Sequence, residues 1–556
     1  MFDSKTTTSF SALKRQDHLN ELQAEEFDLL VIGGGATGCG IALDAASRGM
    51  KTALLEKVDF AAGTSSKSTK LIHGGLRYLK QFEVGLVRET GKERAIVHRL
   101  APHLVLPEKM LLPITTNGTY GKWSASIGVM VYDLLAGVGG KDRRQMLDKK
   151  RTLELEPLLD ESQLEGSCLY AEYRTDDARL TIELIKQATA YGAKAINYCT
   201  VKAFTYDDHK KVNGVQCLDE LSGQSLVVKA KHVVSAGGPW VDQLRTLNGS
   251  KNGKQLHLTK GVHIVFPHHK LPLQYSVYFD VPDGRMIFAI PRGKITYVGT
   301  TDTSYKGSLD NIVATKEDAN YLLEAINHAF PSIDLQLSDI SSNWAGLRPL
   351  IHEEGKSPSE LSRKDEIFES PSDLISIAGG KLTGYRRMAE RIVDLVNSRL
   401  DESFGDCKTD KIPLVSHSLE NSEQVNEYIN QLKRHAPSKS MSDYYRWYLV
   451  TTYGKQTEVI LEKMKSFDDP DDLALARAEL WYGVHHEMVN SLEDFFVRRT
   501  GRLYFDLESI AQVRESLTHD LSKYLNWDST RIEDENKKLN LLISNATNYY
   551  ESDVLV

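Results

Sequence analysis

Cysteine is scarce in this chain, and its few cysteines are not spaced as metal ligands or as redox pairs. The 556 residues include five cysteines, at positions 39, 168, 199, 217 and 407, and none of them has Cys-x-x-Cys spacing. An odd number without this spacing argues against a disulfide framework and a zinc site, and it favours a reducing compartment. His268 and His269 follow Pro267 in what reads as a turn, so we predict no metal site.

Long apolar runs and an excess of positive charge are also missing. Residues 1–26 are polar and contain no apolar core of a signal peptide. The longest apolar stretch, residues 123–140, contains Asp133, and a central Asp costs about 3 kcal/mol on insertion scales. We therefore expect a buried or interfacial segment there. The net charge of −8 argues against nucleic acid as a partner, so an anionic substrate would need a local group of cations.

Glycine becomes rare beyond about residue 401, where charged and periodic segments dominate. This change predicts a helical C-terminal domain over residues 405–556, with a boundary near 400–410. We expect a polar N-terminal extension over residues 1–26 and a nucleotide-binding region with interspersed substrate-domain segments over residues 27–400. The predicted fold class is α/β, with a Rossmann-like nucleotide-binding domain, an inserted β-sheet substrate domain and the helical C-terminal domain.

Residues 27–56 read as a complete βαβ unit. A strand (27–32), a helix (36–47) and a second strand (51–55) surround the motif Gly33-x-Gly35-x-x-Gly38. The first glycine permits a tight turn, the second a close approach to a pyrophosphate, and the third close helix packing. Glu56 ends the second strand, where an acid accepts a hydrogen bond from a ribose hydroxyl. An acid there favours FAD or NAD over NADP.

Three more segments could contact such a cofactor. They are the hydroxyl-rich run 62–78, the strand and turn 233–240, and the glycine-rich turn 377–384. Several such turns suit a cofactor longer than NAD, which favours FAD without excluding NAD. Residues 226–235 and 295–299 are further strand candidates.

Seven stretches resemble FAD-dependent glycerol-3-phosphate dehydrogenases, within the D-amino-acid-oxidase-like flavoproteins. They are residues 32–50, 64–80, 178–180, 260–265, 298–304, 346–350 and 379–387, of which LIHGGLRYL and GGKLTGYR are the most specific. The region from about 405 also resembles the additional C-terminal domain of this family. The resemblance implies that non-covalently bound FAD oxidises sn-glycerol 3-phosphate to dihydroxyacetone phosphate and that a membrane quinone takes the electrons.

Other flavoprotein activities remain open at this stage. Glycerophosphate oxidases share these motifs and pass electrons to oxygen, but they usually contain a middle insert that this chain lacks. An amine or amino-acid oxidase and a non-catalytic FAD-binding protein are the remaining alternatives. Because a quinone lies in the bilayer, we expect a cytoplasmic protein bound peripherally at the inner face of the cell membrane. Residues 123–140 and the segment Phe10–Leu22 are the candidate membrane contacts. The sequence leaves open whether the C-terminal helices mediate a homodimer or bind another partner.

Five residues are candidates for proton transfer or for binding of the substrate. His263 is the candidate proton acceptor, with a buried structural histidine as the alternative. Arg348 is the candidate ligand for a phosphate or an oxyanion, with an internal salt bridge as the alternative. Lys381 is the second candidate cation, unless it is simply solvated at a helix start. Arg77 and Tyr78 are candidate substrate contacts, with packing on the sheet as the alternative.

The remaining site predictions concern the cofactor. Thr301 and Asp302 are expected in a turn beside it. The predicted contacts with FAD are Gly33, Gly34, Gly35, Thr37, Gly38, Glu56, Thr64, Ser65, Ser66, Lys70, Leu71, His73, Gly74, Gly75, Val201, Ala236, Gly237, Gly346, Gly380, Lys381, Leu382 and Thr383.

Overall fold

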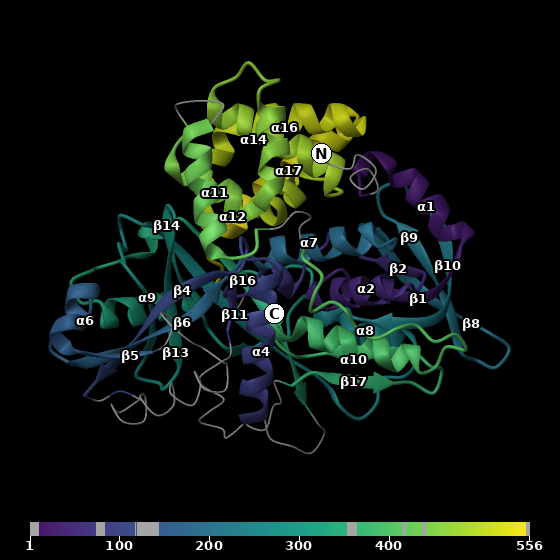
Figure 1. Ribbon diagram of the computed structural model, residues 1–556, viewed down its shortest axis with the longest axis horizontal. Helices are drawn as coiled ribbons and strands as arrows, with labels where there is room; N and C mark the ends of the chain where they lie inside the picture. Colours follow the sequence, from purple (N-terminus) through teal and green to yellow (C-terminus); the bar gives the residue numbers. More distant parts are fainter. Residues whose placement is uncertain are drawn as a thin grey trace.

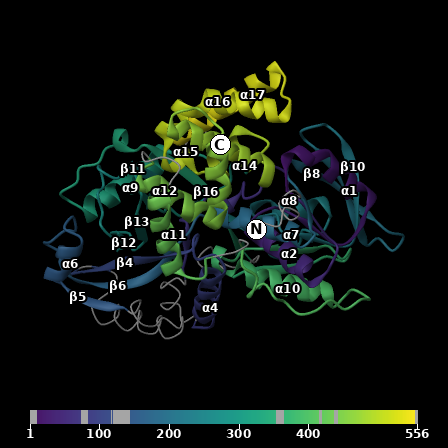
Figure 2. The same ribbon diagram turned by 45° about the horizontal axis from the view of Figure 1, so that its top comes forward.

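Two β-sheets and a group of helices make up the described molecule (Figure 1). The computed structural model describes residues 10–73, 84–116, 118, 144–352, 364–414, 419–435 and 441–551. The C-terminal helices lie above both sheets in Figure 1 and come forward when the molecule is turned in Figure 2. This arrangement confirms the predicted fold class, which combines a nucleotide-binding α/β part, a second sheet-rich part and a helical C-terminal part.

The first sheet contains the predicted βαβ unit. Within the described residues its strands are β1 (Glu26–Ile32), β2 (Thr52–Leu55), β7 (Lys194–Ile196), β8 (Cys199–Tyr206), β9 (Val212–Asp219), β10 (Ser225–Ser235), β17 (Glu366–Glu369) and β18 (Ile375–Ala378). Strands β18, β10, β1, β2 and β7 lie in this order, and each neighbouring pair is parallel. The strands predicted at 27–32, 51–55 and 226–235 are confirmed as β1, β2 and β10.

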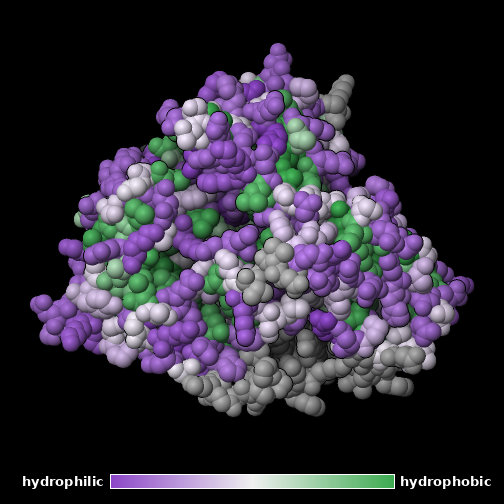
Figure 3. Space-filling view, turned by 180° about the vertical axis from the view of Figure 1, so that it is seen from behind, coloured by the Kyte–Doolittle hydropathy of each residue, from purple (hydrophilic) through white to green (hydrophobic). Residues whose placement is uncertain are grey.

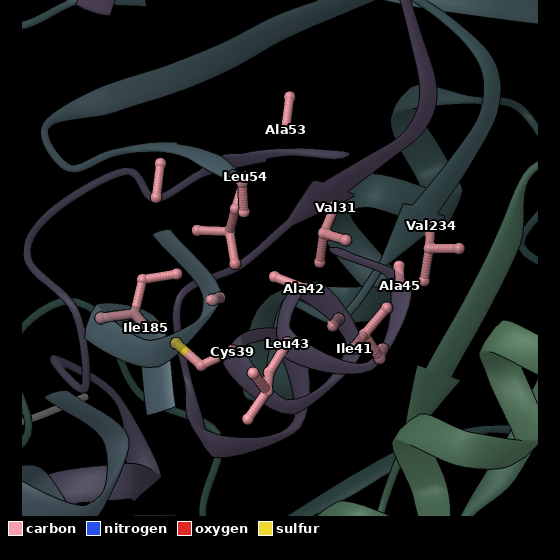
Figure 4. Packing of buried hydrophobic residues seen from close by; sticks show 14 of the residues in the cluster. Val31, Cys39, Ile41, Ala42, Leu43, Ala45, Ala53, Leu54, Ile185 and Val234 are labelled. Carbon is pink, nitrogen blue, oxygen red and sulfur yellow. The ribbon is translucent and has the colours of Figure 1, made fainter. Parts of the chain in front are cut away.

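Helix α2 (Ala36–Arg48) packs on this sheet through small side chains. Ala42 and Ala45 are fully buried, and Figure 4 shows them beside Val31 of β1 and Val234 of β10. Helices α7 (Asp177–Ala190) and α10 (Tyr385–Asn397) flank α2. Short side chains let the helix lie close to the strands, so its N-terminus stays next to the turn that follows β1.

The second sheet is mainly antiparallel. Its described strands are β3 (Leu71–Ile72), β4 (Leu106–Thr115), β5 (Gln145–Asp148), β6 (Leu164–Arg174), β11 (Gln255–Pro267), β12 (Ser276–Asp280), β13 (Met286–Arg292), β14 (Ile295–Gly299), β15 (Thr303–Ser304) and β16 (Ser342–His352). The strand predicted at 295–299 is confirmed as β14. Strand β11 pairs with β14 on one side and β16 on the other, so His263 lies opposite both Gly299 and Trp344.

Shorter helices connect and cover the two sheets. They are α1 (Arg15–Ala24), α4 (Val84–Leu100), α6 (Lys149–Leu155), α8 (Val241–Leu247) and α9 (Lys316–Ala329). The sequence suggested Phe10–Leu22 as a membrane contact, and the structure corrects this. Phe10, Leu19 and Leu22 are at most 4 % exposed and belong to the core under the first sheet. The apolar face of this segment is therefore used for packing, so it is not available to a bilayer.

The helical part begins with α11 (Ser422–His435) and lies against the second sheet. It continues with α12 (Asp443–Tyr453), α13 (Thr457–Met464), α14 (Asp471–His486), a π-helix (Asp494–Arg499), α15 (Arg502–Phe505), α16 (Leu507–Leu525) and α17 (Ser529–Thr547). Trp344 and Tyr297 of the sheet share one hydrophobic cluster with Phe495 and Tyr504 of the helices. The two parts are therefore joined by a continuous core.

Of the helices that the structure describes, none combines the length and the apolar content needed to cross a bilayer. On the face seen from behind in Figure 3, hydrophobic residues lie in separate groups among hydrophilic ones.

Candidate active site

Four parallel strands of the first sheet end at the same edge. The last residues of β1, β2 and β10 are paired directly, because Ile32 lies opposite both Leu55 and Ser235. The turns that follow these strands begin with Gly33, Glu56 and Ala236, and the turn after β18 contains Gly379 and Gly380. The carboxyl ends of parallel strands are where open α/β sheets bind ligands. Three predicted cofactor segments thus meet at this edge.

The three glycines of the nucleotide fingerprint, Gly33-x-Gly35-x-x-Gly38, have different roles. Gly33 has φ +115°, and a Cβ there would lie 2.5 Å from the Ala236 carbonyl oxygen. A Cβ on Gly38 would lie 1.9 Å from the Gly33 carbonyl oxygen. A Cβ on Gly35 would meet only Ser65 Oγ, at 3.1 Å. The fold itself requires the first and third glycines, whereas the second leaves open space at the helix N-terminus. This space fits the pyrophosphate of a dinucleotide.

Glu56 lies beside the same turn. Its carboxylate accepts hydrogen bonds from the backbone N–H of Gly34 (2.6 Å) and of Val58 (2.9 Å). Burial raises the pKa of Glu56, although both hydrogen bonds act against the rise. The carboxylate is half-buried and keeps lone pairs for a ribose hydroxyl, as expected for the adenosine end of FAD.

Other predicted cofactor residues lie near this edge of the first sheet. Ser65 Oγ accepts a hydrogen bond from the N–H of Ala36, the first residue of α2, at 3.0 Å. Val201 lies on β8, whose first residue Cys199 donates its N–H to the Glu56 carbonyl at 2.8 Å. The Lys70 side chain is buried and binds Asp177 (2.5 Å) and the Ser66 carbonyl (3.1 Å). A contact of Lys70 with the cofactor would therefore involve its backbone.

Gly35 offers a test of the cofactor site that leaves the fold intact. We expect Gly35→Val to weaken FAD binding at least about 100-fold, because its side chain would occupy the space reserved for the pyrophosphate. Circular dichroism would show whether the variant is folded, and the visible spectrum would show whether the purified protein contains flavin. A folded and colourless protein is expected, whereas a yellow variant with normal FAD affinity would contradict this placement of the pyrophosphate.

A cavity of about 260 Å³ opens where the two sheets meet. It is lined from four directions, by the 64–73 segment, by β11 and β16, by β12 and β13, and by the turns at 300–302 and 380–383. The lining residues are Thr64, Lys67, Ser68, Thr69, Leu71, His73, Gly261, His263, Tyr278, Arg285, Met286, Phe288, Thr300, Thr301, Asp302, Gly346, Leu347, Arg348, Pro349, Leu350, Gly380, Lys381, Leu382 and Thr383. The predicted residues His263, Arg348 and Lys381 thus lie around one space.

His263 is almost fully buried in the wall of this cavity. Its ring stacks on Trp344 with 4.7 Å between centroids and 10° between planes, and its Nε2 lies 2.9 Å from the Thr69 hydroxyl. Its Nδ1 has no hydrogen-bond partner within the described part of the chain. Burial lowers the pKa of His263 well below its ordinary value, and the charges of Arg348 and Lys70 lower it further. The imidazole is therefore neutral near pH 7, the state that accepts a proton.

Arg348 extends from β16 over the turn after β14. Its guanidinium donates to the Thr300 hydroxyl (2.8 Å), the Thr301 carbonyl (3.1 Å) and the Asp302 carboxylate (3.3 Å). Both charged side chains remain 28 % exposed, toward the cavity. The internal salt bridge considered as an alternative thus exists, and the same arginine also lines the cavity.

Two glycines make room for these side chains. A Cβ on Gly299 would lie 2.1 Å from the His263 ring, and a Cβ on Gly261 would lie 2.3 Å from an Arg348 nitrogen. Both glycines are on strands that pair across the site, Gly299 opposite His263 and Gly261 opposite Gly346. The positions of the His263 and Arg348 side chains therefore depend on glycines outside the nucleotide fingerprint.

The turn that follows β18 closes the cavity. Thr383 donates its hydroxyl to the His73 carbonyl at 3.1 Å, which joins the 380–383 turn to the 64–73 segment. On the other side, Gly346 approaches Lys67 so closely that a Cβ would lie 2.5 Å from the Lys67 Cβ. Thr64 donates its hydroxyl to the Leu347 carbonyl at 2.7 Å. The hydroxyl-rich segment thus lies between the two sheets, as its predicted role beside the cofactor requires.

Some predicted residues cannot be placed, and some lining residues were not predicted. Gly74, Gly75, Arg77, Tyr78 and the segment 123–140 lie outside the described residues. Sequence reasoning missed Lys67, Thr69 and Arg285. The first two stand within the hydroxyl-rich run, so a closer reading of that run could have included them. Arg285 follows a turn between β12 and β13, and the local sequence contains no signal for its place in the cavity.

Comparisons with known proteins agree with this site. Residues 28–379 match the model of the FAD dependent oxidoreductase family. Residues 407–532 match the C-terminal domain of alpha-glycerophosphate oxidase. The first match includes every strand of the nucleotide-binding sheet except the start of β1, and the second includes most of the C-terminal helices.

Several known proteins are similar over the full chain. The aerobic glycerol-3-phosphate dehydrogenase of Bacillus subtilis is 49 % identical over 548 residues, which are 97 % of this chain and 98 % of the relative. The enzyme of that name from Staphylococcus saprophyticus is 47 % identical over 545 residues, again 97 % of this chain and 98 % of the relative.

Solved structures agree with these relatives. The X-ray structure of the glycerol-3-phosphate dehydrogenase from Bacillus halodurans complexed with FAD has a TM-score of 0.83 and 42 % identity, and the match covers 97 % of this chain and 99 % of that one. The L-alpha-glycerophosphate oxidase of Mycoplasma pneumoniae, with FAD bound, has a TM-score of 0.56 and 19 % identity, over 70 % of this chain and 98 % of that one, which shows a shared fold. The chain therefore belongs to the FAD-dependent oxidoreductase family and, within it, to the aerobic glycerol-3-phosphate dehydrogenases.

Proposed function

We propose that this chain oxidises sn-glycerol 3-phosphate to dihydroxyacetone phosphate with FAD and delivers the electrons to a membrane quinone. The observation that carries the proposal is the cavity in which a neutral His263 and the cations Arg348 and Lys381 lie together next to the dinucleotide site. Oxidation of a phosphorylated secondary alcohol needs a proton acceptor, a phosphate ligand and a hydride acceptor in one place.

The residues divide these tasks. The planar guanidinium of Arg348 can bind two oxygens of a phosphate at once, and Lys381 adds a second positive charge. The His263 imidazole accepts the C2 hydroxyl proton as the carbonyl forms. Bound FAD supplies the hydride acceptor. Burial of His263 and stacking on Trp344 keep the imidazole in one orientation, so little reorganisation is needed during the reaction.

A second cavity supports a separate site for the electron acceptor. This cavity has a volume of about 320 Å³. It is adjacent to the first cavity, because Thr64, Lys67, Gly346 and Leu347 line both. It is also lined by Trp344 and Tyr504, and by Leu541 of α17, which is 59 % exposed. Apolar and aromatic side chains of this lining could hold a quinone ring, although the charged residues Lys57, Asp310 and Glu493 also line the cavity.

The proposed acceptor implies contact with a membrane. Because no described helix could span a bilayer, we propose a peripheral contact at the inner face of the cell membrane. Of the two candidate segments, Phe10–Leu22 is the less favoured, because Phe10, Leu19 and Leu22 are buried and Leu13 is its exposed leucine, at 49 %. The segment 123–140 remains the candidate, on the basis of its composition.

Anaerobic reduction of the bound flavin tests the proposed reaction. We expect sn-glycerol 3-phosphate to bleach the FAD absorbance completely, and glycerol or simple amines to leave it unchanged, because these compounds lack the phosphate that Arg348 would bind. A chain that retains FAD and is not bleached by the phosphate ester would contradict the proposal. Bleaching by an amine alone would favour the amine oxidase alternative.

Reoxidation of the reduced flavin separates the two acceptors. A short-chain quinone should restore the FAD absorbance much faster than dissolved oxygen does. Formation of hydrogen peroxide at the rate of turnover would instead identify an oxidase.

A further inference from the structure

The loop that follows β2 is held from two sides. On one side it contacts the phosphate-binding turn, because Gly34 donates its N–H to Glu56 and Ala61 donates its N–H to the Gly34 carbonyl at 2.9 Å. Ala61 has φ +65°, a left-handed conformation that costs a non-glycine residue about 1 kcal/mol or more. A loop with such a residue needs support from elsewhere in the molecule.

The support comes from the C-terminal helices, through Asp59. This carboxylate is completely buried. It accepts hydrogen bonds from Arg498 Nε at 2.7 Å and from both terminal nitrogens of Arg499, at 2.8 and 3.0 Å. Asn197 donates to it at 2.9 Å. A buried carboxylate is tolerated only when it is paired in this way. Asp59 is thus a fixed point between the cofactor loop and the helical domain.

The two arginines that bind this carboxylate are consecutive in the sequence. Arg498 and Arg499 are the last two residues of the π-helix Asp494–Arg499. Such turns are frequent at functional sites. Further hydrogen bonds, from Arg498 to Asp494 (2.8 Å) and from Arg499 to the Glu487 carbonyl (2.7 Å), hold both side chains in place.

A second contact holds the C-terminal end of the loop that follows β2, at Lys67. Lys67 donates to the Tyr504 hydroxyl at 2.7 Å, and Ser342 donates to the Tyr504 carbonyl at 2.8 Å. Arg498, Arg499 and Tyr504 therefore bind on both sides of Thr64–Ser66. This turn contains Ser65, the hydrogen-bond partner of α2.

We propose that the C-terminal helical domain is a functional part of the FAD site, in which Arg498 and Arg499 act as positioning residues through Asp59. They keep residues 56–67 in the conformation that binds the dinucleotide, so the domain sets the affinity for FAD without touching it. The proposal rests on the cofactor site alone and is independent of the substrate. Because coupling is reciprocal, binding of FAD must also stabilise the π-helix.

A matched pair of variants tests the first consequence. Arg499 and Arg502 are both buried, but Arg502 binds Glu479 (2.8 Å) and Ser509 (3.2 Å), which belong to the helical domain itself. Both Arg499→Gln and Arg502→Gln should lower thermal stability. Only Arg499→Gln should raise the Kd for FAD, by about tenfold or more, as measured by fluorescence titration of the deflavinated protein. At saturating FAD its kcat should return to within about twofold of wild type, since Arg499 is buried and does not line the cavity that contains His263.

Equal FAD affinity in the two variants, despite a similar loss of stability, would overturn the proposal. Hydrogen exchange of the unmodified protein provides a test that does not depend on a variant folding. FAD should slow exchange in the peptide Glu493–Arg499 as well as in Gly33–Gly38. Protection of the fingerprint without any change in the π-helix would also overturn the proposal. Neither the FAD titration nor the hydrogen-exchange measurement involves glycerol 3-phosphate, so a failed activity assay does not affect these two results.

Discussion

Replacing Arg348 with methionine should lower kcat/KM for sn-glycerol 3-phosphate about 10³-fold while FAD stays bound. Removing one partner of a hydrogen-bonded charge pair that the bound substrate shields from water costs about 2–5 kcal/mol, and each 1.4 kcal/mol corresponds to about a factor of ten. Methionine retains an unbranched apolar stem and removes the guanidinium with its fork of donors. Asp302, which now lies 3.3 Å from the guanidinium, would in addition face the substrate phosphate without an intervening cation, which adds repulsion.

The way in which this loss is distributed identifies the role of the arginine. A rise in KM with unchanged kcat would mean that Arg348 binds the phosphate equally in the ground and transition states. A fall in kcat would mean that it stabilises charge that develops during the reaction. Steady-state kinetics with the flavin spectrum as a check on FAD content measures both.

Arg285 provides the control for this experiment. It lines the same cavity, but it is bound to Asp283 (2.7 Å) and lies over the Tyr321 ring (4.2 Å). Arg285→Met should change kcat/KM less than about tenfold, as expected for a charge at the rim. If Arg348→Met has an equally small effect, Arg348 is only the structural partner of Asp302 and the phosphate is bound elsewhere.

His263→Gln should reduce the rate of flavin reduction about 10²- to 10⁴-fold, the usual contribution of a general base. Glutamine retains hydrogen-bonding capacity beside Thr69 and fits the space that Gly299 leaves, so FAD should remain bound. Anaerobic stopped-flow mixing with the substrate measures this step without the later reoxidation. A variant that reduces its flavin at the wild-type rate would show that His263 is a structural histidine stacked on Trp344.

The pH dependence of the wild-type rate should show the environment of His263. Burial, Arg348 and Lys70 lower its pKa well below the ordinary value of 6.5. The reduction rate at saturating substrate should therefore stay constant from pH 8 to below 6.5, and the acid limb should appear only below that value. An acid limb at or above pH 6.5 that His263→Gln removes would contradict this expectation.

The lowered pKa of His263 also makes the free energy of unfolding depend on pH. Below pH 6.5 the unfolded chain binds a proton at His263 and the native protein does not, so acidification lowers the free energy of unfolding. Above pH 6.5 neither state binds this proton, and the contribution is constant. The melting temperature of wild type should therefore fall more steeply than that of His263→Gln between pH 7 and pH 5.

Much of the nucleotide-binding part could be predicted because its signals are local. The turn after β1 needs Gly33 for its positive φ and Gly38 for the packing of α2 on that turn, and both requirements appear as glycines at fixed spacing. Glu56 follows β2 directly, so its place at the same edge follows from parallel pairing alone. The motifs downstream then pointed to the family that the full-length relatives show.

The protonation state of His263 and the pairing of Arg348 could not be predicted, because they depend on contacts between distant segments. The sequence left His263 open as a base or a core residue. The structure makes it neutral through burial against Trp344 and through the charge of Arg348, both on β16. It also shows that Arg348 is paired with Asp302, which lies beyond β14. A pKa is set by the whole surroundings of a group, and these surroundings exist only after the strands have paired.

The sequence by itself determined the dinucleotide-binding motif, because backbone conformation and helix packing restrict individual positions to glycine or to an acid. Its resemblance to known motifs indicated the family. Only the tertiary structure decided that Phe10, Leu19 and Leu22 are buried and that Asp59 is paired with Arg498 and Arg499. Amphipathic composition does not specify which surface will cover an apolar face. Nor does any local pattern connect residues some 440 positions apart, since only the folded chain brings those charges together and removes them from water.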